Sequence, residues 1–134
     1  SHREPSNQGP PRKIYHRTSA GDEELQHWLR SGPEVHTDRL SWLAQVGFLE
    51  TLDSNGQQQF LTELRDEFIR HREELLTIEV HWQREDPRFP DRLSINEFFA
   101  HCTLRLGVMK YATIVEWCEQ CLARLNARKN IEKE

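Results

Sequence analysis

The chain has 134 residues, 30% of them charged, and a formal net charge of −4 at pH 7. This length allows one moderate core, and several Trp and Phe residues beside a mean hydropathy of −0.82 indicate a folded protein with a polar surface rather than a disordered one. No apolar run approaches the roughly 20 residues that span a bilayer, and no signal peptide opens the chain, so we predict a cytoplasmic protein without a membrane segment.

A basic β-hairpin is predicted at the start of the chain. Turn residues stand at 9–11, and Ile14 and Tyr15 are typical of the outgoing strand. Residues 1–17 carry a net charge of +3, whereas the remainder carries −7, so we expect this end to contact a polyanion. Long cations near a hairpin turn can reach DNA phosphates, and the alternative is a plain surface hairpin. The predicted DNA-binding residues are Arg12, Lys13 and Arg17.

The rest of the chain is predicted to be helical. Thr18 suits an N-cap, and Gly32-Pro33 is a stop signal. Asp53-Ser54-Asn55-Gly56 is expected to form a turn, and the tail from Ala127 to be charged and frayed. The predicted helices run from Thr18 to about Ser31, from about Thr37 to Val46, from Gln57 to about Arg84, and from about Ser94 to Asn126.

The two long helices carry apolar residues at alternating spacings of four and three, once His71 is admitted to the series. In the last helix, Phe99, Cys102, Leu106 and Met109 make the apolar surface wider than one partner helix needs. We therefore predict that a second copy covers the surplus in a two-fold dimer. The predicted dimerisation residues are Phe60, Leu64, Phe68, Leu104, Val108, Tyr111, Val115, Trp117 and Leu122.

No catalytic, metal or cofactor site is predicted. Cys118-x-x-Cys121 lies within a predicted helix and lacks a second pair, so both cysteines are expected to be small buried residues rather than zinc ligands or a redox pair. Phosphate-binding glycine loops and nucleophile motifs are absent from the sequence, which argues against an enzyme. A set of aromatic residues fits either the core or an effector pocket: Trp28, Trp42, Phe48, Trp82 and Trp117.

Two motifs resemble the PadR-type transcriptional regulators. The first, Arg12-Lys13-x-Tyr15-x-x-Thr18-x-x-Gly21 with Leu25 and Trp28-Leu29, is similar to that family's wing and following helix. The second, Leu104-Arg105-Leu106-Gly107 with Tyr111 and Glu116-Trp117-Cys118-Glu119-x-x-Leu122-x-x-Leu125, is similar to its last dimerisation helix. The order and spacing of the two strengthen the resemblance.

The resemblance implies a mainly α fold in which a short β-hairpin wing, a winged-helix remnant, precedes a helical dimerisation domain. The expected parts are the wing and linking helix at 1–31, the dimerisation domain at 37–126 and the tail at 127–134. The family's helix-turn-helix would precede Ser1, so we expect a fragment of a longer regulator or a truncated relative.

The implied function is DNA-binding transcriptional regulation by a homodimer, which would bind an operator through two winged-helix domains. A small-molecule effector or a protein partner would shift the dimer geometry. The alternative is a helical protein–protein interaction module without a DNA function.

Overall fold

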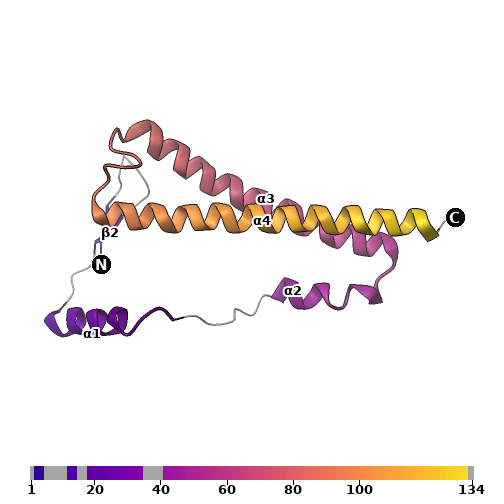
Figure 1. The fold of residues 1–134 in the computed structure, drawn as a ribbon, viewed down its shortest axis with the longest axis horizontal. Coiled ribbons are helices and arrows are strands. Elements are labelled where there is room, and N and C mark those ends of the chain that lie inside the picture. Colours follow the sequence, from indigo (N-terminus) through magenta and orange to yellow (C-terminus); the bar gives the residue numbers. More distant parts are fainter. Residues whose placement is uncertain (1, 5–11, 15–17, 35–40, 133–134) are drawn as a thin grey trace. The chain divides into compact units, whose positions relative to one another are not determined.

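The computed structural model describes residues 2–4, 12–14, 18–34 and 41–132, the first two ranges by their backbone only. The chain divides into two compact units near residue 47. The first unit holds β1 (His2–Glu4), β2 (Arg12–Ile14), α1 (Ser19–Arg30) and α2 (Ser41–Val46). The second holds the 3₁₀ helix η1 (Leu49–Thr51), α3 (Ser54–Glu85) and α4 (Ile95–Glu132) (Figure 1).

The predicted fold class is confirmed as mainly α and is wrong in its β-hairpin wing. The only strands among the described residues are β1 and β2, which pair antiparallel over three residues each, from His2 opposite Ile14 to Glu4 opposite Arg12. The strands of a wing are long enough to form a sheet with the rest of their domain. Strands of three residues that pair only with each other are too short for this. The two apolar residues Ile14 and Tyr15 predict a strand but not its length.

The helix α1 begins and ends where the sequence predicts. The hydroxyl of Thr18 accepts a hydrogen bond from the Gly21 N–H at 3.0 Å, which satisfies one unpaired donor of the first turn. After the helix, Gly32 has φ of +98°, a conformation that favours glycine and turns the chain out of the helix. None of the residues of α1 is buried.

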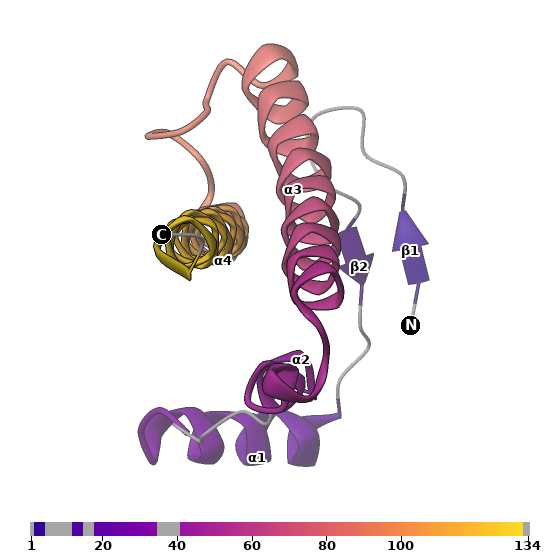
Figure 2. The same ribbon diagram turned by 90° about the vertical axis from the view of Figure 1, so that its right-hand side faces the viewer.

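The second unit is a hairpin of two long antiparallel helices, α3 and α4, which lie side by side in both views (Figures 1 and 2). At its open end, Lys129 Nζ donates to Gln58 Oε1 at 2.7 Å, so the end of α4 lies beside the beginning of α3. At its closed end, residues 86–94 connect the helices. The apolar stripes of both helices meet between them, where Leu61, Val108, Val115 and Cys118 are buried.

Three helix boundaries differ from the predictions. The helix α3 begins at Ser54 rather than Gln57, because the Asp53 carboxylate caps it by accepting from the Gly56 N–H at 2.8 Å. The helix α4 continues to Glu132, past the predicted end at Asn126. The helix α2 begins at Ser41, while the predicted start at Thr37 lies outside the described residues.

Candidate functional site

Some of the residues predicted for dimerisation line the interface between α3 and α4. Phe68 and Tyr111 pack with ring centroids 5.6 Å apart, and His71 contacts both rings at 5.8 and 5.5 Å. His71 therefore belongs to the apolar series, as predicted. Val108 and Val115 are buried on the same stripe of α4, and the predicted residues Phe60, Leu64, Leu104, Trp117 and Leu122 are partly exposed.

One glycine permits close packing in the middle of the hairpin. A Cβ atom at Gly107 would lie 2.7 Å from Leu75 Cδ1, which is too close for two carbon atoms without a shift of the Leu75 side chain. The motif Leu104-Arg105-Leu106-Gly107 therefore includes a point of close approach between the helices. This packing role belongs to one chain and needs no second copy.

The closing turn of the hairpin contains an ion-pair network around the buried carboxylate of Asp86, which the sequence did not predict. The carboxylate of Asp86, almost fully buried, accepts from the Arg88 backbone N–H at 3.0 Å and from Arg88 Nε and Nη2 at 3.0 and 2.9 Å. Trp82 Nε1, also buried, donates to the same carboxylate at 3.3 Å. Hydrogen bonds from Arg88 are the main cause that lowers the pKa of Asp86 from 3.8 to about 2.

The same arginine reaches the first turn of α4. Arg88 Nη2 lies 3.1 Å from Glu97 Oε2, so one guanidinium neutralises two carboxylates from the two sides of the turn. Ser94 accepts from the Glu97 N–H at 3.3 Å and donates to Glu97 Oε1 at 2.8 Å, so Ser94 caps α4. The spacing Ser94-x-x-Glu97 was the available signal for this cap.

A second polar group joins the helices about two turns away from the closing loop. The Glu79 carboxylate accepts from Arg105 Nη1 at 2.7 Å and lies 2.9 Å from His101 Nε2. The His101 ring packs edge-on against Trp82 and Phe89, with centroids 5.7 and 4.6 Å apart. Trp82 therefore belongs to the packed closing turn, which favours the core interpretation of this aromatic residue over an effector pocket.

The cysteines have the environment expected of packing residues. Cys118 is fully buried, Cys121 is partly buried, and burial raises the pKa of both thiols. Cys102 is exposed. Within the described part of the chain, no group of three or more His, Cys, Asp or Glu side chains is arranged to hold a metal ion.

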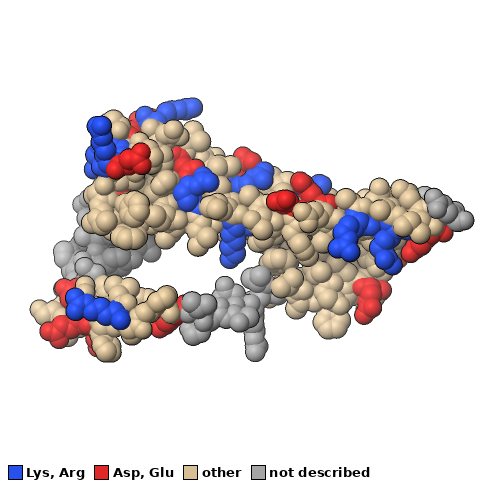
Figure 3. Space-filling model, in the orientation of Figure 1, with Lys and Arg blue, Asp and Glu red and all other residues tan. Residues whose placement is uncertain are grey.

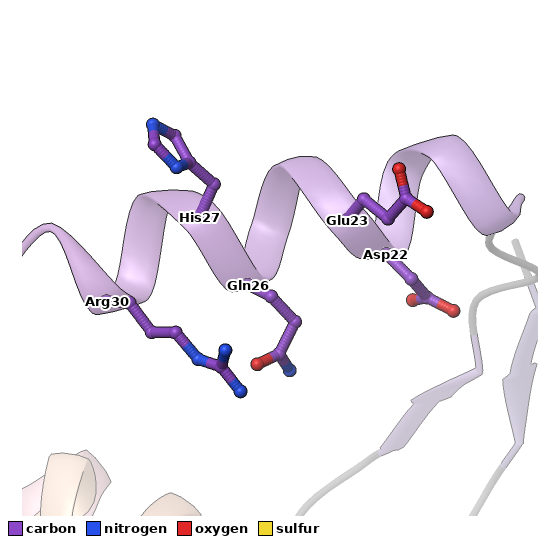
Figure 4. Close-up of a pocket in the computed structure, with 5 residues that line it drawn as sticks. All are labelled: Asp22, Glu23, Gln26, His27 and Arg30. Carbon is purple, nitrogen blue, oxygen red and sulfur yellow. The ribbon is translucent and has the colours of Figure 1, made fainter.

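A shallow hollow runs along α1 and has both charge signs in its lining. Figure 4 shows its side chains, which all project from this one exposed helix. Trp28, from the same helix, donates through Nε1 to Glu34 at 2.6 Å and is half exposed. An open surface of one helix encloses no ligand. The lining residues are Asp22, Glu23, Gln26, His27 and Arg30.

The side chains of the predicted DNA-binding residues lie outside the described part of the structure. Arg12 and Lys13 lie on β2, of which the structure describes the backbone, and Arg17 lies outside the described residues. Among the helices of the described ranges, none has both the length and the apolar character needed to cross a bilayer.

Comparison with known families identifies the helical hairpin. Residues 39–126, more than half of the chain, match the family described as "Virulence activator alpha C-term". The chain belongs to this family. The match covers α2, η1 and α3 entirely and most of α4.

The fold of this virulence activator alpha C-terminal family member is also similar to a solved regulator structure. Bacillus subtilis PadR, crystallised in complex with operator DNA, aligns with a TM-score of 0.62 and 20% sequence identity over 92% of this chain and 68% of the PadR chain. The resemblance to PadR-type regulators inferred from the motifs is thus confirmed. No protein of curated function matches the sequence.

Proposed function

We propose that the chain acts in the cytoplasm as part of a PadR-type transcriptional regulator that binds operator DNA as a homodimer. The observation that carries the proposal is the fold similarity to PadR, a protein crystallised with its operator, over 92% of this chain. The family match over residues 39–126 supports the same assignment. The second unit, in this proposal, forms the dimer, and the positively charged N-terminal segment contacts DNA.

The geometry of the helical hairpin suits a dimerisation unit. In two-fold regulators, the distance between the DNA-binding parts must match the spacing of the operator half-sites. Two helices of 32 and 38 residues, closed at one end by the Asp86–Arg88–Glu97 network, form a long element suited to hold such a distance.

The charge distribution supports DNA contact at the N-terminal end. Residues 1–17 carry a net charge of +3 on a chain of net charge −4. Arg12, Lys13 and Arg17 would neutralise phosphates and position the protein, which adds affinity without base specificity. The rest of the chain, with a net charge of −7, would be repelled by DNA elsewhere.

Titration of DNA binding against salt tests this proposal in the full-length protein encoded by the gene. The double change Arg12→Ala/Lys13→Ala should weaken binding to all sequences about equally and lower the salt slope by about one for each lost phosphate contact. Arg124→Ala/Arg128→Ala removes the same charge from exposed positions of α4 and should change neither the relative affinities nor the slope. DNA binding that is absent at low salt would contradict the proposal.

A further inference from the structure

A shallow groove of about 500 Å³ runs along one side of α3. Val80 in its centre is 48% exposed, and Leu76 beside it is partly exposed. An acidic residue lies at one end of this apolar centre and two basic residue types lie at the other. We call the six residues that line it the α3 groove: Glu73, Leu76, Thr77, Val80, His81 and Arg84.

The α3 groove faces away from α4. Leu75 marks the side of α3 that packs on α4, because it lies against Gly107 of that helix. Thr77 and Arg84 lie about 160° and 180° around the helix from Leu75. Figures 1 and 2 show α4 on one side of α3 only. The partner helix of the hairpin therefore leaves the groove uncovered.

The charges of the groove are complementary to those of a second, antiparallel copy. Its residues form three pairs about the midpoint between Ile78 and Glu79, namely Glu73 with Arg84, Leu76 with His81, and Thr77 with Val80. In a two-fold contact between antiparallel helices, residues at equal distances on either side of the axis lie at the same height. Glu73 would therefore face Arg84 of the second copy, and Arg84 would face its Glu73.

We propose that the α3 groove binds the same groove of a second copy, with the two α3 helices antiparallel and the two-fold axis between Ile78 and Glu79. This contact joins one homodimer to another and is separate from the contact that forms each homodimer. The inference rests on the homodimer of the proposed function. It adds a second association surface, through which two regulator dimers would bind neighbouring operator sites cooperatively.

Electrostatics favours this occupant and this orientation. The antiparallel arrangement forms one Glu73–Arg84 ion pair at each end of the contact, about 16 Å apart. A parallel arrangement would place Glu73 against Glu73 and Arg84 against Arg84, which like-charge repulsion disfavours. Basic and acidic side chains are interspersed on the side of the hairpin in view in Figure 3, so no field of one sign on that side repels a second copy.

The contact is small, which defines when it forms. Leu76 and Val80 are the apolar residues that each copy contributes, so the buried area stays below that of a stable interface. Exposed ion pairs also add little affinity on their own. Two dimers held on one DNA molecule have a high effective concentration, and a weak contact is then sufficient for cooperative binding.

Sedimentation velocity of the full-length protein tests the contact without DNA. A tetramer of the unchanged protein should accumulate as the concentration rises from about 10 to 500 µM, by mass action. Glu73→Arg and Arg84→Glu each place like charges in contact and should weaken the association of dimers by at least about tenfold. The double change Glu73→Arg/Arg84→Glu exchanges the two charges and should restore it.

A matched control separates the contact from a general effect of charge. Glu74→Arg makes the same change of charge at the next residue, which is exposed and lies about 100° further around the helix. This variant should associate like the unchanged protein. Circular dichroism checks that all variants keep their helices.

Binding to DNA tests the consequence for regulation. A duplex with two copies of the operator obtained by selection, separated by whole turns of the double helix, should bind two dimers cooperatively. Each single change should abolish the cooperativity and leave binding to one operator unchanged, and the double change should restore the cooperativity.

The outcomes separate this inference from the proposed function. A tetramer that each single change dissociates and the double change restores supports the contact. Dimers that do not associate further, that associate equally in all variants, or that the double change fails to restore overturn the contact and keep the homodimer. A groove that binds only a different protein also overturns it. A protein that stays monomeric overturns both the contact and the homodimer, while operator binding is judged by the salt titration.

Discussion

Arg88 and Asp86 form a two-pronged ion pair, with Arg88 Nε and Nη2 at 3.0 and 2.9 Å from the two carboxylate oxygens of Asp86. The Asp86 side chain is buried, and the same guanidinium reaches Glu97 at the start of α4. A buried carboxylate is tolerated when hydrogen bonds and an opposite charge replace its water. The pair therefore links the end of α3 to the beginning of α4.

Loss of the arginine should open this turn. Arg88→Ala leaves the buried carboxylates of Asp86 and Glu97 without the half-exposed cation that they share, and a buried charge without a partner is destabilising. We expect the thermal midpoint of unfolding to fall by several degrees. Arg84→Ala, at an exposed position of the last turn of α3, is the control and should change the midpoint little; equal effects of the two changes would contradict the role of the network.

The lowered pKa of Asp86 predicts a pH dependence of stability. Because this pKa is about 2 in the folded protein and 3.8 for an ordinary Asp, the stabilising effect is complete above about pH 5 and is lost as the pH falls from about 5 to 2. Asp86→Asn should therefore be less stable than the unchanged protein at pH 7, and the difference should shrink toward pH 2. Urea unfolding midpoints measured across this range check the trend, which a constant difference would refute.

The cap of α4 should contribute separately. Ser94→Ala removes the hydroxyl that accepts from the Glu97 N–H and should cost about 1 kcal/mol in the free energy of unfolding. Ser54→Ala, next to the capping residue Asp53 of α3, should have little effect, since Ala favours a helix. Chemical unfolding of both variants measures the contrast.

The spacing of apolar residues was enough to predict the two long helices, because an apolar position recurs every three or four residues along each of them. Thr18 and Gly32-Pro33 likewise marked the ends of α1 through purely local chemistry. The Asp86–Arg88–Glu97 network was not predictable in this way. Arg88 lies in the loop between the helices, where the sequence has no periodic pattern. Only the folded turn brings its side chain to Glu97.

The same spacing did not show which helix covers the apolar stripe of α4. Leu104, Val108, Tyr111 and Val115 were predicted as dimerisation residues, but a regular stripe does not say which helix covers it. In the structure α3 lies against this stripe, with Phe68 packed on Tyr111.

The short apolar segment at Ile14 and Tyr15 did not indicate how long the strand would be. A wing was therefore expected where β1 and β2 pair over only three residues each.

The buried and the exposed apolar residues of α4 should respond differently to truncation. Val108→Ala removes two buried methyl groups from the packing on α3 and should cost about 2 kcal/mol at any protein concentration. Leu106→Ala changes an exposed residue and should affect only the concentration-dependent part of stability, as expected for a dimer contact. Unfolding midpoints at 1 and 100 µM distinguish these cases, and a concentration-dependent effect limited to Val108→Ala would reverse the assignment.

The assignment to a DNA-binding regulator is tested most directly by selection of binding sites. The full-length protein is incubated with a pool of random DNA duplexes, and the bound fraction is sequenced over successive rounds. We predict enrichment of one sequence with two similar half-sites in inverted orientation, because a two-fold dimer presents its DNA-binding parts symmetrically. A pool that stays random after repeated rounds would contradict the account.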